Sequence, residues 1–412
     1  MARSLQPLDV TIQIPYHFRC PISLELMTDP VIVGTGQTYD RSSIESWIAT
    51  GNTTCPVTRL PLTDFTLIPN HTLRRLIQDW CVANRSNGVD RIPTPKQPAD
   101  PVMVQSLLKQ ASSVSNSSHV RLSAVRKLRV LARDSDNNRF VISTQNACEI
   151  LLNLLFSDPS GNSSELTHEL VAVLSSLAIS ESECVLVASD PARISDLISL
   201  LTHSSIDVRV NSAVLLENVF AGTRSQELRS EITSHGDLFT GIVGILDHPL
   251  PHPRALKVGI KALFAFCMVK QHRHKAVEAG AAAAIINRLP DFEKCDAERA
   301  LATVELLCRI PSGCVAFASH DVVVPLLVKI MMNISDRATE YAAGALMSLC
   351  SAVERLQVDA VAAGVFTKLL LLVQSDCTER AKRKAQMLLK LLRNAWPENS
   401  FMNSGGGDAG LF

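Results

Sequence analysis

The sequence predicts a small α+β module followed by an all-α right-handed solenoid. Hydrophobic residues make up 46% of the 412 residues and aromatic residues only 5%, which favours helices packed through aliphatic side chains. The long C-terminal region repeats a helical pattern at a nearly constant spacing, which is typical of a solenoid. A proline-rich stretch separates this region from a compact N-terminal segment, so the two parts are expected to fold as separate domains.

Shifts in composition indicate five segments along the chain. Residues 1–14 form an N-terminal extension and residues 15–89 form the compact module. Residues 90–102 are expected to be a stiff linker, because four prolines fall within ten residues there. The repeat region covers residues 103–396, and a glycine-rich tail, residues 397–412, is expected to be flexible.

Segments that open leucine- or alanine-rich helices recur along the repeat region. Successive segments begin 41 to 45 residues apart, at Asn146, Pro191, Gly236, Gly280, Asp321 and Gly364. This period, with two or three helices in each unit, is typical of armadillo or HEAT repeats, whose stacked units leave a concave groove. The agreement of successive spacings argues against an irregular helical bundle. A recurring Gly or Asp before each third helix suits a tight corner and favours about six armadillo repeats.

Two similar tetrapeptides mark the N-terminal module, Cys20-Pro21-Ile22-Ser23 and Cys55-Pro56-Val57-Thr58. Zinc-binding RING domains place Cys-x-x-Cys pairs at such turns, but here Ser or Thr stands at the second position. The other candidate ligands in the module are Cys81, His17 and His71, whereas two tetrahedral zinc sites need about eight ligands. The module is therefore expected to bind no metal.

Local patterns predict helices and short strands in this module. Asp40 is suited to cap a helix that carries Ile44, Trp47 and Ile48 on one face, and Asn70 is suited to cap a second helix. The expected strands are residues 31–33 and 65–68.

A domain of this size has a marginal apolar core and needs further links to be stable. Cys20 is expected to be a small buried residue that shapes its loop rather than a nucleophile. The polar residues expected to form buried networks between the two loops are Ser23, Glu25, Asp40, Thr58 and Asn70.

The segment FRCPISLELMTDPVIVGTGQTYDRSSIESWI, followed by CPVTRLPLTDFTLIPNHTLRRLIQDWC, resembles a U-box, the metal-free relative of the RING domain. With the linker and the repeats, the chain resembles the plant U-box ubiquitin ligases with armadillo repeats. The resemblance implies a RING-type E3 ubiquitin ligase that needs no cofactor and forms no covalent intermediate with ubiquitin. Such a ligase places a ubiquitin-charged conjugating enzyme (E2) beside a lysine of the substrate.

The resemblance also assigns roles to residues of the U-box. Ile22 and Leu24 in the first loop, Pro56 in the second and Trp47 on the helix between them are expected to contact the E2. Arg59 matches the position whose guanidinium bridges the E2 and ubiquitin. From the residues alone, Trp47 also suits the core, Pro56 a turn and Arg59 an ordinary surface charge.

The same resemblance suggests how the whole chain acts. The armadillo groove is expected to hold the protein substrate or a regulator, in plant defence or environmental-stress signalling. A homodimer formed through the U-box is a further expectation.

Composition argues against several other functions. The formal net charge is zero, which argues against nucleic-acid binding, and no apolar run is long enough to span a membrane. The N-terminal residues lack the apolar stretch of a secretory signal, so the eleven cysteines are expected to be reduced. The expected location is the cytoplasm, with the nucleus as a second compartment. No cysteine pairs with a histidine in a recognisable motif, which disfavours a thioester-forming ligase.

Three alternatives stay open. One is a non-catalytic armadillo scaffold that uses the U-box only for docking or dimerisation. Another, a subunit of a splicing complex, resembles the chain only over the U-box. A third open question is the role of the basic segment ERAKRK, residues 379–384. This segment suits either a solvated cap of the solenoid or a site for an acidic or phosphorylated partner.

Overall fold

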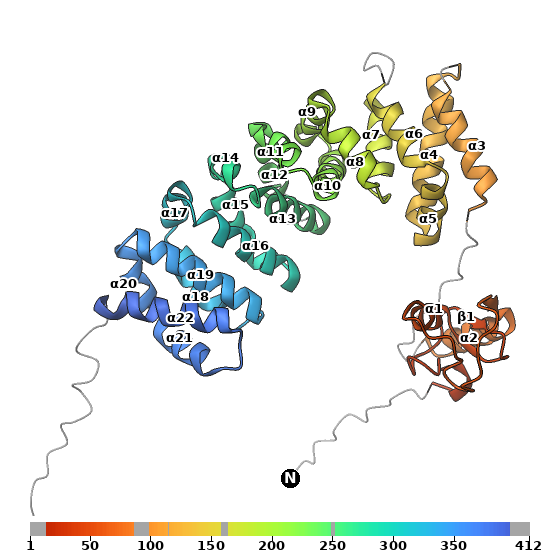
Figure 1. Ribbon diagram of the computed structural model, residues 1–412, viewed down its shortest axis with the longest axis horizontal. Helices are drawn as coiled ribbons and strands as arrows, with labels where there is room; N and C mark the ends of the chain where they lie inside the picture. Colours follow the sequence, from red (N-terminus) through yellow and green to blue (C-terminus); the bar gives the residue numbers. More distant parts are fainter. Residues whose placement is uncertain (1–13, 86–98, 114, 158–163, 249–251, 396–412) are drawn as a thin grey trace, which may run out of the picture. The chain divides into compact units, whose positions relative to one another are not determined.

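The computed structural model describes residues 14–85, 99–113, 115–157, 164–248 and 252–395 (Figure 1). The chain divides into two compact units, residues 1–97 and residues 98–412. The predicted extension before Ile14, the linker as far as residue 98 and the tail 397–412 lie outside the described residues.

The N-terminal unit contains a three-stranded sheet in the order β2-β1-β3. β1 (Pro30–Ile32) pairs with β2 (Thr38–Asp40) and β3 (Ile68–Pro69), antiparallel in both cases. The turn between β1 and β2 contains Gly36 at a φ of 80°, which suits a residue without a side chain. β1 begins and ends one residue earlier than the strand predicted at residues 31–33.

The predicted strand at residues 65–68 is wrong apart from Ile68, the first residue of β3. The carboxylate of Asp64 accepts hydrogen bonds from the backbone N–H of Thr66 at 2.8 Å and from its hydroxyl at 2.6 Å. This local bonding occupies a backbone donor that a strand would need, so the segment turns instead.

Two helices and a 3-10 turn complete the N-terminal unit: η1 (Tyr16–Phe18), α1 (Arg41–Ala49) and α2 (His71–Ala83). Asn70 caps α2, because its Oδ1 accepts a hydrogen bond from the backbone N–H of Leu73 at 3.0 Å. The buried core consists of Phe18, Cys20, Met27, Val31, Val33, Tyr39, Ile44, Cys55, Leu62, Ile77 and Cys81.

An ion-pair cluster joins both helices to the turn before β1. The carboxylate of Asp29 pairs with Nε of Arg41 at 2.8 Å and with Nη2 of Arg74. The Arg74 side chain is buried, and this burial lowers its pKa. A buried guanidinium needs a carboxylate partner, so Asp29 links α1 to α2.

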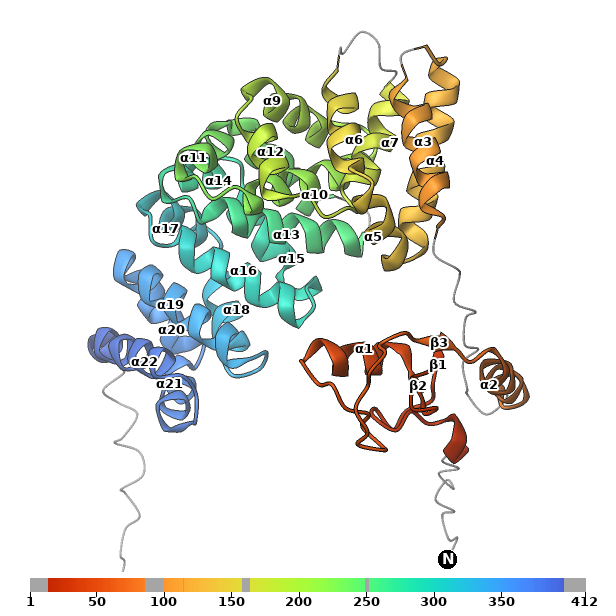
Figure 2. The same ribbon diagram turned by 45° about the vertical axis from the view of Figure 1, so that its right-hand side comes forward.

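The second unit is a stack of helices, one set of which forms a continuous face, here called the inner face. Each of these helices packs against the next, and Figures 1 and 2 both place α13 beside α16. The inner-face helices are α4 (Ser118–Asp134), α7 (Ser164–Leu174), α10 (Ile206–Gly222), α13 (Pro253–Cys267), α16 (Lys294–Leu307), α19 (Asp336–Ala352) and α22 (Glu379–Leu391).

The remaining helices cover the other faces of the stack. α3 includes Pro101 and Val102, which the sequence analysis assigned to the linker. These helices are α3 (Pro101–Ser112), α5 (Asp136–Thr144), α6 (Ala147–Phe156), α8 (Glu181–Ala188), α9 (Pro191–Ser199), α11 (Gln226–Ser234), α12 (Gly236–Leu246), α14 (Arg273–Glu278), α15 (Ala281–Arg288), α17 (Pro311–Ala318), α18 (Val323–Ile330), α20 (Arg355–Ala362) and α21 (Val365–Gln374). The 3-10 turns are η3 (Leu200–Thr202), η4 (Lys270–His272), η5 (Leu289–Asp291) and η6 (Leu392–Ala395).

The prediction of a small α+β module followed by an all-α solenoid is confirmed. The tight corner expected before each third helix is present at Asn146, Gly280 and Gly364, which have φ values of 55°, 87° and 80°. It is absent at Gly236, which is the first residue of α12, and at Pro191, where Asp190 caps α9 instead. Among the described helices, none is by itself both long and apolar enough to cross a membrane.

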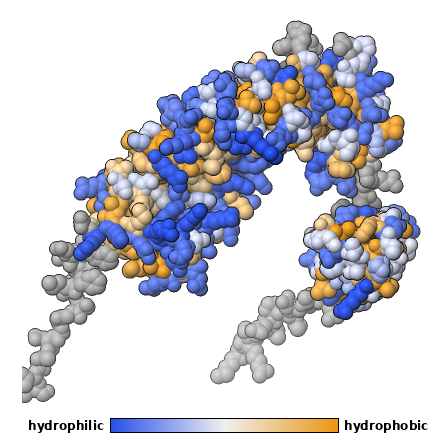
Figure 3. Space-filling view, in the orientation of Figure 1, coloured by the Kyte–Doolittle hydropathy of each residue, from blue (hydrophilic) through white to orange (hydrophobic). Residues whose placement is uncertain are grey.

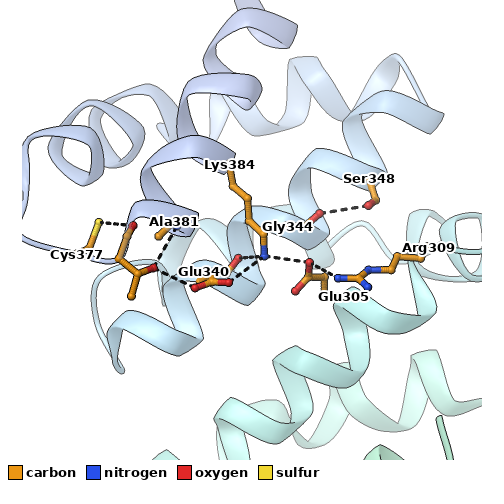
Figure 4. A network of polar contacts seen from close by, with 9 residues as sticks. Glu305, Arg309, Glu340, Gly344, Ser348, Cys377, Ala381 and Lys384 are labelled. Carbon is orange, nitrogen blue, oxygen red and sulfur yellow. Dashed lines mark hydrogen bonds and ion pairs between the residues drawn. The ribbon is translucent and has the colours of Figure 1, made fainter. Parts of the chain in front are cut away.

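Polar side chains connect helices across the inner face (Figure 4). Nζ of Lys384 on α22 lies 3.0 Å from Oε1 of Glu305 on α16 and 3.6 Å from Oε1 of Glu340 on α19. Glu305 also pairs with Nη2 of Arg309 at 3.0 Å. A Cβ atom on Gly344 of α19 would lie 2.6 Å from Oε1 of Glu305. The missing side chain therefore leaves room for Lys384 to reach across α19.

Replacing Asp29 with Ala is expected to destabilise the N-terminal unit by about 3 kcal/mol, because the buried Arg74 loses its carboxylate. Two of the three tryptophans, Trp47 and Trp80, lie in this unit, so tryptophan fluorescence during urea unfolding reports mainly on its stability. Asp79→Ala, which removes an exposed carboxylate of α2, is the matched control. Equal unfolding midpoints for the two variants would contradict the role given to Asp29.

Candidate functional site

The two tetrapeptide loops of the N-terminal unit have the same backbone geometry. In the first loop, the N–H of Leu24 donates to the carbonyl of Cys20 at 2.8 Å. In the second, the N–H of Arg59 donates to the carbonyl of Cys55, also at 2.8 Å. In both loops the cysteine N–H donates at 2.8 Å to the carbonyl five residues later. Leu24 and Arg59 therefore occupy equivalent positions.

Leu24 and Arg59 also share a left-handed backbone conformation, with φ values of 61° and 60°. This conformation costs a residue other than glycine about 1–2 kcal/mol and persists only where the surrounding structure holds it. Both side chains are exposed, Leu24 to 70% of its surface. Each loop thus uses a strained position to direct one large side chain into solvent.

The sulfur of Cys20 holds the first loop to the start of α1. Cys20 is fully buried, and its Sγ accepts a hydrogen bond from the backbone N–H of Asp40 at 3.3 Å. Burial raises the pKa of this thiol, but backbone N–H groups, first those of Ser23 and Asp40, outweigh burial and lower the pKa below its usual value. The sulfur therefore acts as a buried hydrogen-bond acceptor.

Cys55 has the corresponding role in the second loop. Its Sγ accepts a hydrogen bond from Oγ1 of Thr35 at 3.2 Å and lies 3.0 Å from the hydroxyl of Tyr39. That hydroxyl accepts a hydrogen bond from the backbone N–H of Val57 at 3.2 Å. Burial raises the pKa of the thiol, but the hydroxyl groups of Thr35, Thr58 and Tyr39 outweigh burial and set it at about 6. Tyr39 therefore connects β2 to the second loop.

Asp40 connects the first part of the unit to α1 in an unexpected way. It precedes α1, but its carboxylate accepts no capping hydrogen bond from the helix backbone, so the predicted cap is wrong in detail. Instead Oδ1 accepts from the backbone N–H groups of Thr28 at 2.7 Å and Asp29 at 2.8 Å. Oδ2 accepts from the hydroxyl of Ser42 at 2.7 Å. Backbone N–H groups of the turn before β1 therefore donate to the carboxylate that would otherwise cap α1.

The predicted buried polar network is only partly present. The side chains of Glu25 and Ser23 are exposed, so their expected place in such a network is wrong. The backbone carbonyl of Glu25 contributes instead, because it accepts from the N–H of Cys20. Besides capping α2, Asn70 donates from Nδ2 to Oγ1 of Thr38 at 3.4 Å and so ties α2 to β2.

The residues expected to contact an E2 lie on both loops and on α1. Trp47 is half-buried, and its Nε1 donates to the carbonyl of Thr54, next to Cys55, at 2.9 Å. This bond joins α1 to the second loop, so Trp47 serves the core and still presents part of its ring to solvent. Its place in the core is confirmed, and its contact with an E2 stays a prediction.

The other expected contact residues differ in exposure. Ile22 and Pro56 are half-buried, and Ile22 packs against the core. Leu24 and Arg59 are exposed. Among the described residues, no carboxylate pairs with Arg59, so its guanidinium is free to bind another molecule.

Sequence reasoning missed two kinds of residue at this site. Tyr39 and Thr35 bind the sulfur of Cys55, and no local pattern pointed to them. Val57 and Leu60 expose 50% and 56% of their surfaces on the second loop. The parallel tetrapeptides could have revealed Val57, because it is the equivalent of Ile22. Figure 3 shows apolar patches on the visible face of this unit.

The surface of the site differs from its interior in the groups that it offers. Among the residues that the structure describes, no group of three or more His, Cys, Asp or Glu side chains could hold a metal ion. Cys20 and Cys55 are buried and hydrogen-bonded, which makes both of them inaccessible to a substrate. The outward groups are apolar side chains and one guanidinium.

The free energy of unfolding of the N-terminal unit is expected to rise from about pH 6 to about pH 9, because Cys55 loses its proton at lower pH when folded than the ordinary value of 9.0. A lowered pKa in the folded state stabilises fully above the unfolded pKa, and this stabilisation is lost as the pH falls through about 6.

Urea unfolding followed by tryptophan fluorescence at both ends of this range measures the slope. Cys55→Ser is expected to reduce it, because a serine hydroxyl does not titrate there, and Cys295→Ser in the solenoid serves as control. The same slope in all three proteins would show that Cys55 is not held as a thiolate.

Comparison with known proteins places both units in one family. The sequence matches the model of the U-box domain over residues 14–86 and the model of the plant U-box protein ARM repeat region over residues 103–406. An engineered protein of known crystal structure shares the fold, with a TM-score of 0.53 and 19% identity over 80% of this chain and 76% of that one.

Curated plant proteins are similar along the whole length. U-box domain-containing protein 26 of Arabidopsis thaliana is 61% identical over 98% of this chain and 97% of its own length. E3 ubiquitin-protein ligase PUB23 of the same plant is 34% identical over 95% of this chain and 96% of its own. The chain therefore belongs to the plant U-box proteins with an ARM repeat region.

Proposed function

We propose that this chain is a RING-type E3 ubiquitin-protein ligase. The observation that carries the proposal is the pair of matched U-box loops, each of which holds one side chain outward in a strained conformation, Leu24 in one and Arg59 in the other. Similarity to relatives named E3 ubiquitin-protein ligases supports it. In this role the U-box binds a ubiquitin-charged E2 and promotes transfer of ubiquitin to a substrate lysine.

The E2 contact consists of apolar residues on the two loops and α1. Leu24 supplies most of the exposed area, and Ile22 and Pro56 form the half-buried floor beside it. Trp47 fixes the spacing through its hydrogen bond to the second loop. Such a small surface suits a transient complex in which a few residues supply most of the binding energy.

Arg59 acts on the conjugate rather than on the E2 alone. Its unpaired guanidinium donates to carbonyl or carboxylate oxygens of the E2 and of ubiquitin at the same time. This contact restricts a flexible conjugate to arrangements in which the substrate lysine can attack the thioester. About 1.4 kcal/mol of preference for those arrangements makes the transfer ten times faster.

Ubiquitin passes directly from the E2 to the lysine, with no intermediate on this chain. The cysteines of the U-box support this route, because Cys20, Cys55 and Cys81 are all buried. The lysine attacks the thioester carbonyl, the E2 thiol leaves, and an isopeptide bond forms.

The solenoid holds the substrate, and its inner face is the surface offered for this. We place the activity in plant defence or environmental-stress signalling, in the cytoplasm with the nucleus as a second compartment. The free state of all eleven cysteines is in keeping with a reducing compartment. Dimerisation through the U-box is part of the same proposal.

Single-turnover discharge of an E2~ubiquitin thioester to free lysine tests the ligase role. Leu24→Ala is expected to weaken E2 binding about tenfold, because it removes the most exposed apolar contact without disturbing the core. Arg59→Ala is expected to leave E2 binding nearly unchanged but to slow discharge about tenfold at saturating ligase.

Matched controls exist on α2, where Leu76→Ala and Arg75→Ala remove exposed side chains of the same types. Both controls are expected to behave as the wild type, and tryptophan fluorescence checks that every variant is folded. If no E2 of a broad panel supported either discharge or the formation of ubiquitin chains, the result would favour a scaffold that uses the U-box only for docking.

A further inference from the structure

The inner face of the solenoid carries more cations than its carboxylates neutralise, and the surplus is local. At the C-terminal end, Lys384 lies between Glu305 and Glu340, so its charge is matched (Figure 4). Further along, Nζ of Lys261 on α13 lies 2.7 Å from Oε2 of Glu217 on α10. Each of these two lysines is therefore already paired.

The N-terminal half of the same face contains two basic stripes. α4 carries Arg126, Arg129 and Arg133, and α13 carries Arg254, Lys257 and Lys261, at the spacing that places three residues on one side of a helix. Their carboxylate neighbours are Glu165 and Glu169 on α7 and Asp207 and Glu217 on α10.

Part of these stripes is already paired. Arg126 pairs with Glu165 and Glu169, and Nη1 of Arg129 lies 2.9 Å from Oε2 of Glu169. Asp207 lies 3.9 Å from Nε2 of His252. Among the described residues, no carboxylate lies within ion-pair distance of the three remaining cations. These are Arg133, Arg254 and Lys257, here called the basic strip.

Arg254 is held in place by a neutral group. Its Nη2 donates to Oδ1 of Asn211 at 2.7 Å, and Asn211 is buried, with 5% of its surface exposed. The same oxygen also accepts a hydrogen bond at 3.3 Å from Oγ of Ser175, the residue that follows α7. A neutral amide therefore orients the guanidinium without forming an ion pair, and the side chain is partly exposed.

Neighbouring guanidinium groups add to this positive potential. Partial burial lowers the pKa of Arg254, the carboxylate of Asp207 opposes that effect, and the charges of Arg133 and Arg129 lower the pKa further. Like charges near one another raise the free energy of the unbound face, and an anion bound there would lower it.

We propose that the basic strip binds an acidic segment of the protein substrate, with a carboxylate or phosphate oxyanion held by Arg254 and Arg133. This proposal rests on the proposed function, in which the inner face holds the substrate. Exposed guanidinium groups with free N–H donors bind such oxyanions through paired hydrogen bonds. Charge complementarity therefore selects an acidic peptide over a basic or neutral one.

Fluorescence anisotropy of labelled peptides, titrated with the full chain at low salt, tests the proposal. The probes are poly-glutamate, poly-glutamine of the same length and a phosphoserine peptide without acidic residues. Binding of poly-glutamate but not of poly-glutamine is expected, with affinity falling as salt rises. Tighter binding of the phosphoserine peptide would identify phosphate rather than carboxylate as the preferred oxyanion. Equal binding of poly-glutamate and poly-glutamine would overturn the proposal.

Arg254→Gln and Arg133→Gln are each expected to raise the Kd of poly-glutamate about tenfold. The matched control is Arg224→Gln, which removes an arginine that is 84% exposed and already paired with Glu181 on α8. The control is expected to stay within about twofold of the wild type. Equal losses in all three variants would show attraction by overall charge alone and would overturn the assignment.

The same variants separate this proposal from the ligase role. Discharge of the E2 thioester to free lysine depends on the U-box, so it is expected to be unchanged in Arg254→Gln. Thermal unfolding followed by circular dichroism checks that the solenoid of each variant is intact. Normal discharge with undiminished peptide binding in both strip variants would overturn the basic strip and leave the ligase proposal standing.

Discussion

The U-box depends on two buried sulfur atoms that accept hydrogen bonds. Cys20 receives backbone N–H groups, and Cys55 receives hydroxyl groups from Thr35 and its neighbours. Each sulfur holds a loop whose fifth residue is in the left-handed conformation, so the strain at Leu24 and Arg59 is balanced by bonds in the interior. A RING domain achieves the same constraint with zinc. Here the donors are part of the chain, so the site forms only when β2, α1 and both loops are folded together.

This dependence explains why the U-box tolerates so small a core. Asp40 binds the turn before β1, and Asp29 in that turn binds both helices. Tyr39, next to Asp40, reaches the second loop through its hydroxyl. Adjacent residues of β2 therefore hold the turn before β1 and the second loop, and few of these bonds can break alone. Folding of such a network is cooperative, because each polar group is costly to leave buried without its partner.

The sequence predicted the parts that local chemistry or periodicity determines. The repeat spacing predicted the solenoid, and the cap at Asn70 follows from its place before an amphipathic helix. Asp40 joins a buried network as predicted, but its capping bond and the buried side chain of Glu25 were predicted wrongly, because long-range partners decide where a polar side chain points. Tyr39 looked like an ordinary strand residue until the second loop supplied its partner.

The pairs across the inner face were equally hidden in the sequence. Glu217 and Lys261 are 44 residues apart, close to one repeat, whereas Glu305 and Lys384 are 79 apart. The second pair needs Gly344 in the helix between them, and no pattern in the sequence signals such a crossing.

The net charge of zero hides how unevenly charge is arranged on the solenoid. Forty basic and forty acidic residues cancel over the whole chain, yet the basic strip has no carboxylate of its own. Nucleic-acid binding would need a longer run of cations, since affinity for a phosphate backbone grows with each contact. Glu169 pairs with Arg126 and Arg129, and Glu217 pairs with Lys261, so the run of unpaired cations stays short. A group of unpaired cations this short, bordered by carboxylates, can bind only a few acidic groups of a peptide. It therefore fixes where along the inner face the acidic segment of that peptide binds.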